Sequence, residues 1–91
     1  MQFSAILRAV RTARGMTQEA LATAAGLDRT EVVKLETGAR KGTAARVVVG
    51  LAKALDVQPG VMLCAVKAQD EDAPALAKAF KVPVATLRGA S

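Results

Sequence analysis

The sequence predicts an all-α protein, and three observations lead to this prediction. First, 20 of the 91 residues are alanine, which favours the helix while burying little area per residue. Second, aliphatic residues recur at helical spacing, and no run of alternating β-branched residues interrupts them apart from Val47–Val49, which fits a helical period. Third, Phe3 and Phe80 are the only aromatic residues, so Leu, Val and Ile must supply the core. A chain of this length suits one small domain and leaves little for a second independent core.

Five helices are expected in the first two thirds of the chain, each bounded by residues that start or stop helices. Ser4 is expected to cap the first helix, and Gly15 to end it in a left-handed conformation. Pro59 suits the first turn of the fifth helix, because a proline there loses no hydrogen bond. The expected helical ranges are 4–14, 17–25, 28–36, 43–55 and 59–66.

The last quarter of the chain is expected to form an extension. Gln69–Asp72 is an acidic break and the best candidate for a linker, and helices are expected at 73–80 and 83–88. We therefore divide the chain into a domain at 1–66 and a C-terminal helical extension at 67–91.

The most informative segment is residues 17–38, TQEALATAAGLDRTEVVKLETG, which predicts two short helices joined by a tight turn. Thr17 can cap the first of them, and Gly26 supplies the turn. Asp28 opens the second helix, where Glu31 completes a capping box. Such a pair with a polar, basic outer face on its second helix is a helix-turn-helix, a unit that inserts this helix into the major groove of DNA.

Residues 6–63 resemble the repressor-type helix-turn-helix family of phage repressors, Cro proteins and XRE-type regulators. Five short segments carry the resemblance in order: LRAVR at 7–11, RGMTQEALA at 14–22, GLD at 26–28, VVKLETG at 32–38, and LAKAL at 51–55 with Val57. The resemblance implies a compact five-helix, lambda-repressor-like domain that binds a palindromic operator as a dimer.

The outward face of the second helix holds the candidate base-contacting residues, and arginine and threonine are suited to this by their chemistry. Arginine can bind guanine O6 and N7 in a bidentate fashion, threonine offers a hydroxyl and a methyl group, and an outward valine can contact a thymine methyl. A valine at this position could equally be partly buried, and the lysine could reach either a base or a phosphate. The candidates are Arg29, Thr30, Val33 and Lys34.

Other residues are expected to bind phosphates or to hold the fold. In similar proteins the residue equivalent to Gln18, at a helix N-terminus, contacts a phosphate, and free N–H groups there welcome an anion. Arg40, Lys41 and Thr43 join a basic loop to the start of a helix and can grip the DNA backbone without reading sequence. For each set, an ordinary solvated surface is the alternative. The resemblance also implies that the arginine of the first helix and the glutamate closing the third form a structural ion pair, here Arg11 and Glu36.

The net charge of +5 lies entirely in the first part of the chain. Residues 1–69 hold 10 Lys and Arg against 5 Asp and Glu, whereas residues 70–91 hold 3 against 3. A basic surface attracts phosphate. The charge alone would fit an ordinary solvated surface better, but together with the helix-turn-helix it supports double-stranded DNA as the partner.

No enzymatic activity, cofactor or metal is expected. The chain has no histidine and no pair of nucleophile and base, and its one cysteine excludes an internal disulfide. Cys64 lies in an apolar stretch and is expected to be a small buried residue rather than a redox switch. Without a signal-peptide core or an apolar run of about 20 residues, a cytoplasmic location with no membrane contact is expected.

The extension contains a near-repeat whose meaning the residues leave open. LAKAFKV at 76–82 echoes LAKALDV at 51–57, and ALA at 75–77 with Val82 also resembles ALA at 20–22 with Leu27. The tail could therefore be helix-turn-helix-like itself, although convergence on a common helical-hairpin pattern is the simpler interpretation. It lacks a basic cluster, so a role in dimerisation or in capping the core is favoured over DNA binding.

The leading functional hypothesis is a homodimeric transcriptional repressor or autoregulator that binds a palindromic operator, with the third helix in the major groove. The alternative is an antitoxin that uses the same DNA-binding domain and binds a toxin protein through residues 67–91. A module that binds only proteins is a further possibility, against which the outward Arg29, Thr30 and Lys34 argue.

Overall fold

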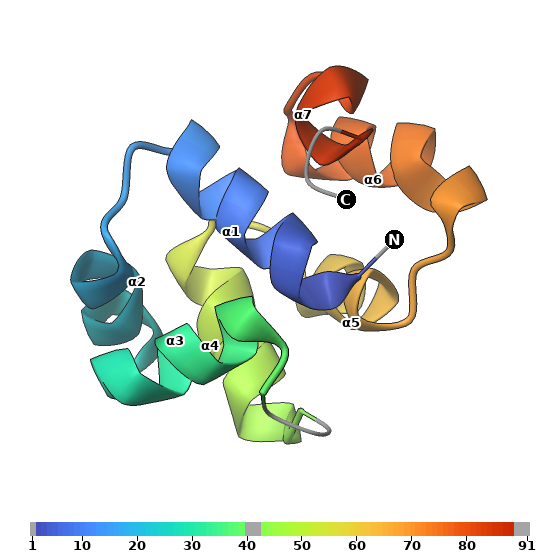
Figure 1. The fold of residues 1–91 in the computed structure, drawn as a ribbon. Helices are drawn as coiled ribbons and strands as arrows, with labels where there is room; N and C mark the ends of the chain where they lie inside the picture. Colours follow the sequence, from blue (N-terminus) through green and yellow to red (C-terminus); the bar gives the residue numbers. More distant parts are fainter. Residues whose placement is uncertain (1, 40–42, 89–91) are drawn as a thin grey trace.

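The computed structural model describes residues 2–39 and 43–88, and these residues fold into seven α-helices and one short 3₁₀ helix (Figure 1). The prediction of an all-α fold is confirmed. The helices are α1 (Phe3–Ala13), α2 (Gln18–Ala25), α3 (Arg29–Thr37), α4 (Ala45–Ala54), α5 (Pro59–Val66), α6 (Ala73–Phe80) and α7 (Val84–Arg88). The acidic residues proposed as a linker form the 3₁₀ helix η1 (Asp70–Asp72), which leads directly into α6.

Neither Ser4 nor Thr43 begins its helix as expected. Ser4 does not cap α1, because the helix begins at Phe3 after an extended Gln2 whose side chain makes no capping hydrogen bond. The α4 helix begins at Ala45 rather than Thr43, and Ala44 before it is extended. Gln2 makes no capping hydrogen bond and Ala44 has no side chain that could make one, so neither helix begins at a side-chain cap.

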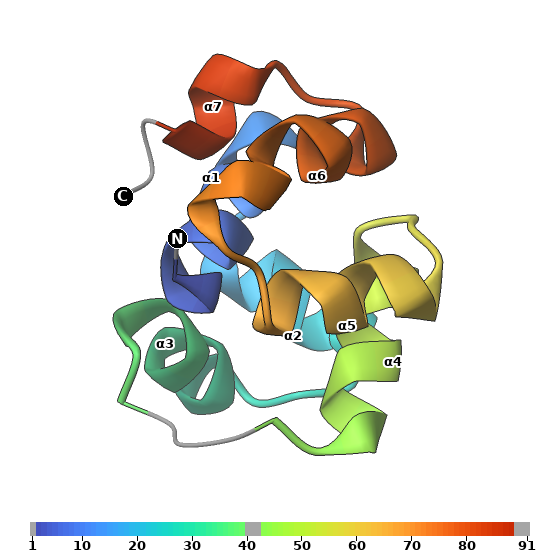
Figure 2. The same ribbon diagram turned by 90° about the vertical axis from the view of Figure 1, so that its right-hand side faces the viewer.

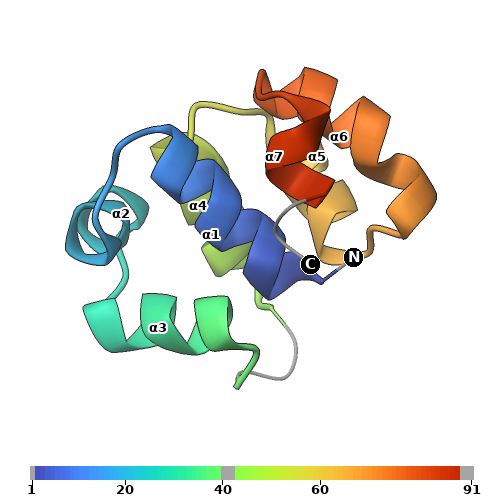
Figure 3. The same ribbon diagram turned by 45° about the horizontal axis from the view of Figure 1, so that its top comes forward.

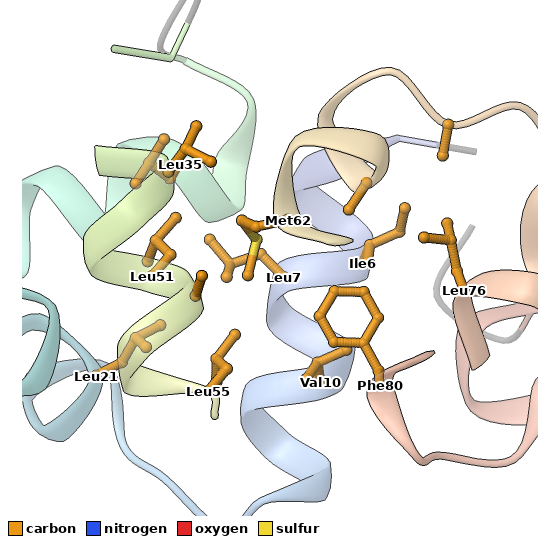
Figure 4. Close-up of a cluster of buried hydrophobic side chains, with 14 of the residues drawn as sticks. Ile6, Leu7, Val10, Leu21, Leu35, Leu51, Leu55, Met62, Leu76 and Phe80 are labelled. Atoms are coloured by element: carbon orange, nitrogen blue, oxygen red, sulfur yellow. The ribbon is translucent and has the colours of Figure 1, made fainter. Parts of the chain in front are cut away.

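The core is built around α1, which lies between two groups of helices. Figures 1 and 3 show α2 and α3 on one side of α1, and α5, α6 and α7 on the other. Leu7 lies near Leu51 and Met62, while Ile6 and Val10 face Leu76 and Phe80 (Figure 4). These side chains belong to a single buried cluster, so one apolar core runs through both groups of helices.

The C-terminal helices join this core through both apolar and polar contacts. Phe80 of α6 and Leu87 of α7 are almost fully buried. Arg14, just after α1, donates from Nε to the carbonyl of Leu55 at 3.1 Å and from Nη2 to the carbonyl of Phe80 at 2.8 Å. One guanidinium therefore holds the ends of α4 and α6 together, since the last carbonyls of a helix lack partners within the helix and favour a cation.

The near-repeat corresponds to the same helix ending used three times. At the ends of α2, α4 and α6, the N–H of the apolar residue bonds the carbonyl of the alanine five positions earlier: Leu27 to Ala22 at 2.8 Å, Val57 to Ala52 at 2.9 Å, and Val82 to Ala77 at 3.0 Å. The residue before each apolar residue is left-handed: Gly26 (φ 71°), Asp56 (φ 58°) and Lys81 (φ 59°). This is the Schellman ending, which satisfies orphan carbonyls and tucks an apolar side chain under the helix. The near-repeat in the sequence is therefore explained by the residues that this helix ending requires.

Gly50 of α4 packs closely on the end of α2. A Cβ placed on Gly50 would lie 2.4 Å from the carbonyl oxygen of Ala25, an impossible contact with backbone. The glycine therefore sets how near α4 can come to the helix that supports α3.

Replacing Gly50 with alanine should lower the free energy of unfolding by about 1–3 kcal/mol, because the helices must separate to admit one methyl group. Urea denaturation followed by circular dichroism measures this change. Gly60→Ala is the matched control, since a Cβ there meets no atom within 4 Å. Equal stability of the two variants would contradict the packing argument.

Candidate nucleic-acid interface

The unit formed by α2 and α3 is set by local hydrogen bonds at its helix ends. Thr17 Oγ1 accepts from the N–H of Ala20 at 3.0 Å and caps α2, as predicted. Gly26 makes the left-handed turn, and Asp28 precedes α3 in a capping box with Glu31, whose Oε1 accepts from the N–H of Asp28 at 3.4 Å. These bonds fix where each helix starts, and so they fix which residues of α3 face outward.

The outer face of α3 carries the four candidate base-contacting residues. Arg29, Thr30 and Lys34 are exposed, and Val33 is partly buried, which answers the question that the sequence left open. The opposite face is buried through Val32, Leu35 and Glu36. Because the four candidates follow helical spacing, they share one face, and it combines two cations, a hydroxyl and part of an apolar side chain.

An ion pair between α1 and α3 holds this face in place. Arg11 donates from Nε to Glu36 Oε2 at 2.6 Å and from Nη2 to Oε1 at 3.0 Å, and its Nη1 donates to the carbonyl of Met16 at 2.8 Å. The side chain of Glu36 is 2% exposed and that of Arg11 is 14% exposed. Such a two-pronged pair fixes both distance and orientation, so α3 has little freedom to rotate against α1.

Gln18 lies at the first position of α2 and joins the same network. Its Nε2 donates to Glu36 Oε1 at 3.2 Å, and its side chain is partly buried. The amide is therefore oriented toward the inside of the unit, while the backbone N–H groups of the first turn of α2 remain at its end. The proposed phosphate contact would thus come from a residue that also ties α2 to α3.

The remaining phosphate candidates lie between α3 and α4. Thr43 is partly buried, two residues before α4 begins. Arg40 and Lys41 lie outside the described residues.

Arg46 is a basic residue of this region that the sequence analysis did not select. It is the second residue of α4, its side chain is 65% exposed, and its Nη2 lies 3.5 Å from Glu31 Oε2 on the first turn of α3. The pair brings a cation from α4 beside the start of α3. Its closeness in sequence to Arg40, Lys41 and Thr43 was the available signal, but only the packing of α4 shows which helical face it occupies.

Cys64 differs from expectation, whereas the test for membrane-spanning helices does not contradict the sequence analysis. Cys64 is exposed, not buried, because none of the residues that the structure describes covers it on the outer face of α5. Within residues 2–39 and 43–88, no single helix is both long and apolar enough to cross a membrane; α4 and α5 together reach the required length and composition, but the chain bends by 117° between them.

A capped helix pair whose second helix presents a polar, basic outer face defines a helix-turn-helix DNA-binding protein. The comparison of the sequence with family models also identifies a helix-turn-helix protein. The helix-turn-helix model that describes Cro-like, phage-repressor-like and XRE-like proteins matches residues 7–61, so the chain belongs to this family and is of the DNA-binding transcription-regulator kind. No curated protein and no solved structure matches the chain. The match ends within α5 and leaves α6 and α7 outside it.

Replacing Glu36 with alanine should lower the free energy of unfolding by about 3–5 kcal/mol, because Arg11 is left largely buried without its partner. Urea denaturation of the variant measures the loss. The double variant Arg11→Met/Glu36→Leu should recover most of it, since no unpaired charge remains. A single variant as stable as the original protein would show that the pair does not hold α3.

Proposed function

We propose that the protein is a sequence-specific transcriptional repressor that acts as a homodimer on a palindromic operator. The observation that carries this proposal is the outer face of α3, where exposed Arg29, Thr30 and Lys34 stand above a buried inner face. A single module of this size buries too little surface to bind one DNA site tightly. Two copies with their α3 helices about 34 Å apart would enter successive major grooves and read a palindrome.

Within this proposal the residues divide into two roles. Arg29 binds guanine, Thr30 and Val33 meet a base edge and a thymine methyl, and Lys34 reaches a base or the adjoining phosphate. The backbone of the operator is held by Gln18, Arg40, Lys41 and Thr43, to which we add Arg46. Their contacts set the register of α3 without reading sequence.

Arg46 is assigned to the backbone because of its place and its partner. Its side chain is mostly exposed beside the start of α3, and the carboxylate of Glu31 orients it there. A surface pair of this kind contributes little stability, so the guanidinium can exchange the carboxylate for a phosphate at small cost.

The alternative, an antitoxin that binds a toxin through residues 67–91, receives less support. Antitoxin segments of that kind would fold on their partner, whereas Phe80 and Leu87 are already almost fully buried against the rest of this chain. The burial favours a regulator whose C-terminal helices complete its own core.

A fluorescence-anisotropy titration tests the function directly. The duplex is the DNA immediately upstream of the protein's own coding sequence, and a scrambled duplex of equal length is the control, each at two salt concentrations. Binding at least about 10³-fold tighter to the upstream duplex is expected for a specific autoregulator. Equal and steeply salt-dependent binding to both duplexes would show only non-specific binding through the basic surface and would contradict specific recognition of this DNA.

In the same assay, Arg29→Ala should cost about 1–3 kcal/mol of binding free energy on the upstream duplex. The ratio between the affinities for the upstream and the scrambled duplex should therefore become smaller. The matched control is Lys78→Ala, which removes an exposed cation from α6. If both variants weaken binding equally on both duplexes, Arg29 does not read a base.

Arg46→Ala should weaken binding to both duplexes by a similar factor and reduce the slope of log affinity against log salt by about 1, because one phosphate contact is lost. Lys53→Ala, which removes an exposed cation from the other end of α4, should leave the slope unchanged. An unchanged slope for Arg46→Ala would contradict the proposed contact between Arg46 and a phosphate.

A further inference from the structure

Val33 is the one apolar residue of α3 that does not belong to the buried face of the helix. Val32, Leu35 and Glu36 form that face, and every other position of α3 carries a charged or hydroxyl side chain. Val33 is partly buried, yet it is not among the partly buried apolar residues that pack against the core in the part of the chain that the structure describes. Packing of the core therefore does not explain a valine at this position.

The position of Val33 makes it part of the face that the proposed function assigns to DNA. Arg29 and Thr30 precede it by four and three residues, and side chains at those separations are neighbours on a helix surface. Lys34 follows it directly. Figure 2 shows α3 and the C-terminal helices α6 and α7 at opposite ends of the molecule, so these two helices do not cover the face.

A valine in a helix presents its two methyl groups in a nearly fixed orientation. Its branched Cβ leaves one strongly preferred χ1 rotamer, whereas the side chains of arginine and lysine keep several rotatable bonds. Val33 therefore loses little side-chain entropy when a ligand covers it. It offers that ligand an apolar surface of defined shape and no group that donates or accepts a hydrogen bond.

Only one group on the base edges of the major groove is apolar. All four bases present donors or acceptors there, and thymine adds the methyl group on C5. The modified base 5-methylcytosine carries the same methyl group on the same ring atom, and it differs from thymine at C4, where an amino group replaces the carbonyl oxygen. A side chain without donors or acceptors cannot detect the difference at C4. The group that fits Val33 is therefore the C5 methyl of a pyrimidine, in either base.

The neighbouring cations fit both base pairs that carry this methyl group. Arginine and lysine side chains only donate hydrogen bonds, so they need acceptors. A thymine–adenine pair offers thymine O4 and adenine N7, and a pair of 5-methylcytosine with guanine offers guanine O6 and N7. Four residues of a helix rise by about 6 Å, and neighbouring base pairs are about 3.4 Å apart. The methyl group therefore lies within about two base pairs of a guanine bound by Arg29.

We propose that Val33 makes operator binding sensitive to the methylation of one pyrimidine in each half-site. Thymine and 5-methylcytosine are accepted at this position, whereas uracil and unmethylated cytosine lack the group that Val33 contacts. Where the pyrimidine is a cytosine, its methylation raises the affinity and regulates binding of the operator. The proposal rests on the sequence-specific binding of the proposed function and adds the chemical feature of DNA that regulates it.

Selection by the full chain from duplexes with a randomised segment supplies the DNA for the test. The enriched sequence is resynthesised with thymine, uracil, 5-methylcytosine or cytosine, each opposite its matching purine, at one symmetry-related pair of pyrimidine positions at a time. Burial of one methyl group corresponds to roughly fourfold in affinity, and of one in each half-site to roughly fifteenfold.

Fluorescence anisotropy measures two affinity ratios at each pair of positions, thymine over uracil and 5-methylcytosine over cytosine. At one pair of positions, both ratios should reach roughly fifteenfold. Both are expected whichever of the two methylated bases binds more tightly, and that last comparison identifies the base that the operator carries.

Val33→Ala should make both differences disappear, because it removes the methyl groups that make the contact. Thr30→Ser is the matched control, since it removes the other methyl group among the four candidate base-contacting residues and keeps the hydroxyl. The differences should persist in this variant. Alanine favours the helix, so Val33→Ala should keep the fold, which circular dichroism checks. Each ratio is measured within one variant, so a general loss of affinity or stability cancels.

The outcomes separate this proposal from the function on which it rests. Differences that persist in Val33→Ala, or that disappear only in Thr30→Ser, would overturn the role of Val33. An enriched sequence that binds equally well with and without each C5 methyl group would overturn it too, while specific binding would stand. A pool from which no sequence is enriched would contradict sequence-specific binding, and with it the proposal.

Discussion

The ion pair between Arg11 and Glu36 is the constraint on which the rest of the structure depends. Glu36 is the one buried charged residue in the part of the chain that the structure describes, and a buried carboxylate is tolerated only when it is paired and hydrogen-bonded. Arg11 supplies two hydrogen bonds to it, and Gln18 supplies a third. Because these three residues come from α1, α2 and α3, the bonds to one carboxylate tie the three helices together. The orientation of the outer face of α3 is therefore set by contacts on its buried side, and the groups that make them need not touch DNA.

Small residues and one further arginine build the rest of the molecule around this centre. Gly50 lets α4 lie against the end of α2, so a core with few aromatic residues is still closely packed. On the other side of α1, Arg14 binds the carbonyls that end α4 and α6. The C-terminal helices consequently share the core of the DNA-binding unit.

The candidate site could be predicted to the extent that it depends on helical period and on caps. Thr17, Gly26 and the capping box of Asp28 and Glu31 place the two helices, and the period of α3 turns its polar residues outward. The same reasoning overlooked Arg46, whose relevance comes from a salt bridge to a residue 15 positions earlier. It also misplaced Cys64, since an apolar neighbourhood in the sequence does not say whether another helix covers that side of α5. Ser4 had the chemistry of a cap, but α1 begins before it.

The sequence by itself determined the helical class, the approximate limits of each helix and the residues on the outer face of α3. These properties depend on backbone hydrogen bonds and side chains within about four positions, which a linear pattern records directly. The family resemblance added the pairing of Arg11 with Glu36, across 25 positions. Only the tertiary structure decided that Arg14 reaches carbonyls 41 and 66 positions away, that α6 and α7 complete the core, and that one side of α5 stays open. Those features depend on which helix covers which face, and burial of that kind is a property of the packed molecule, not of any segment.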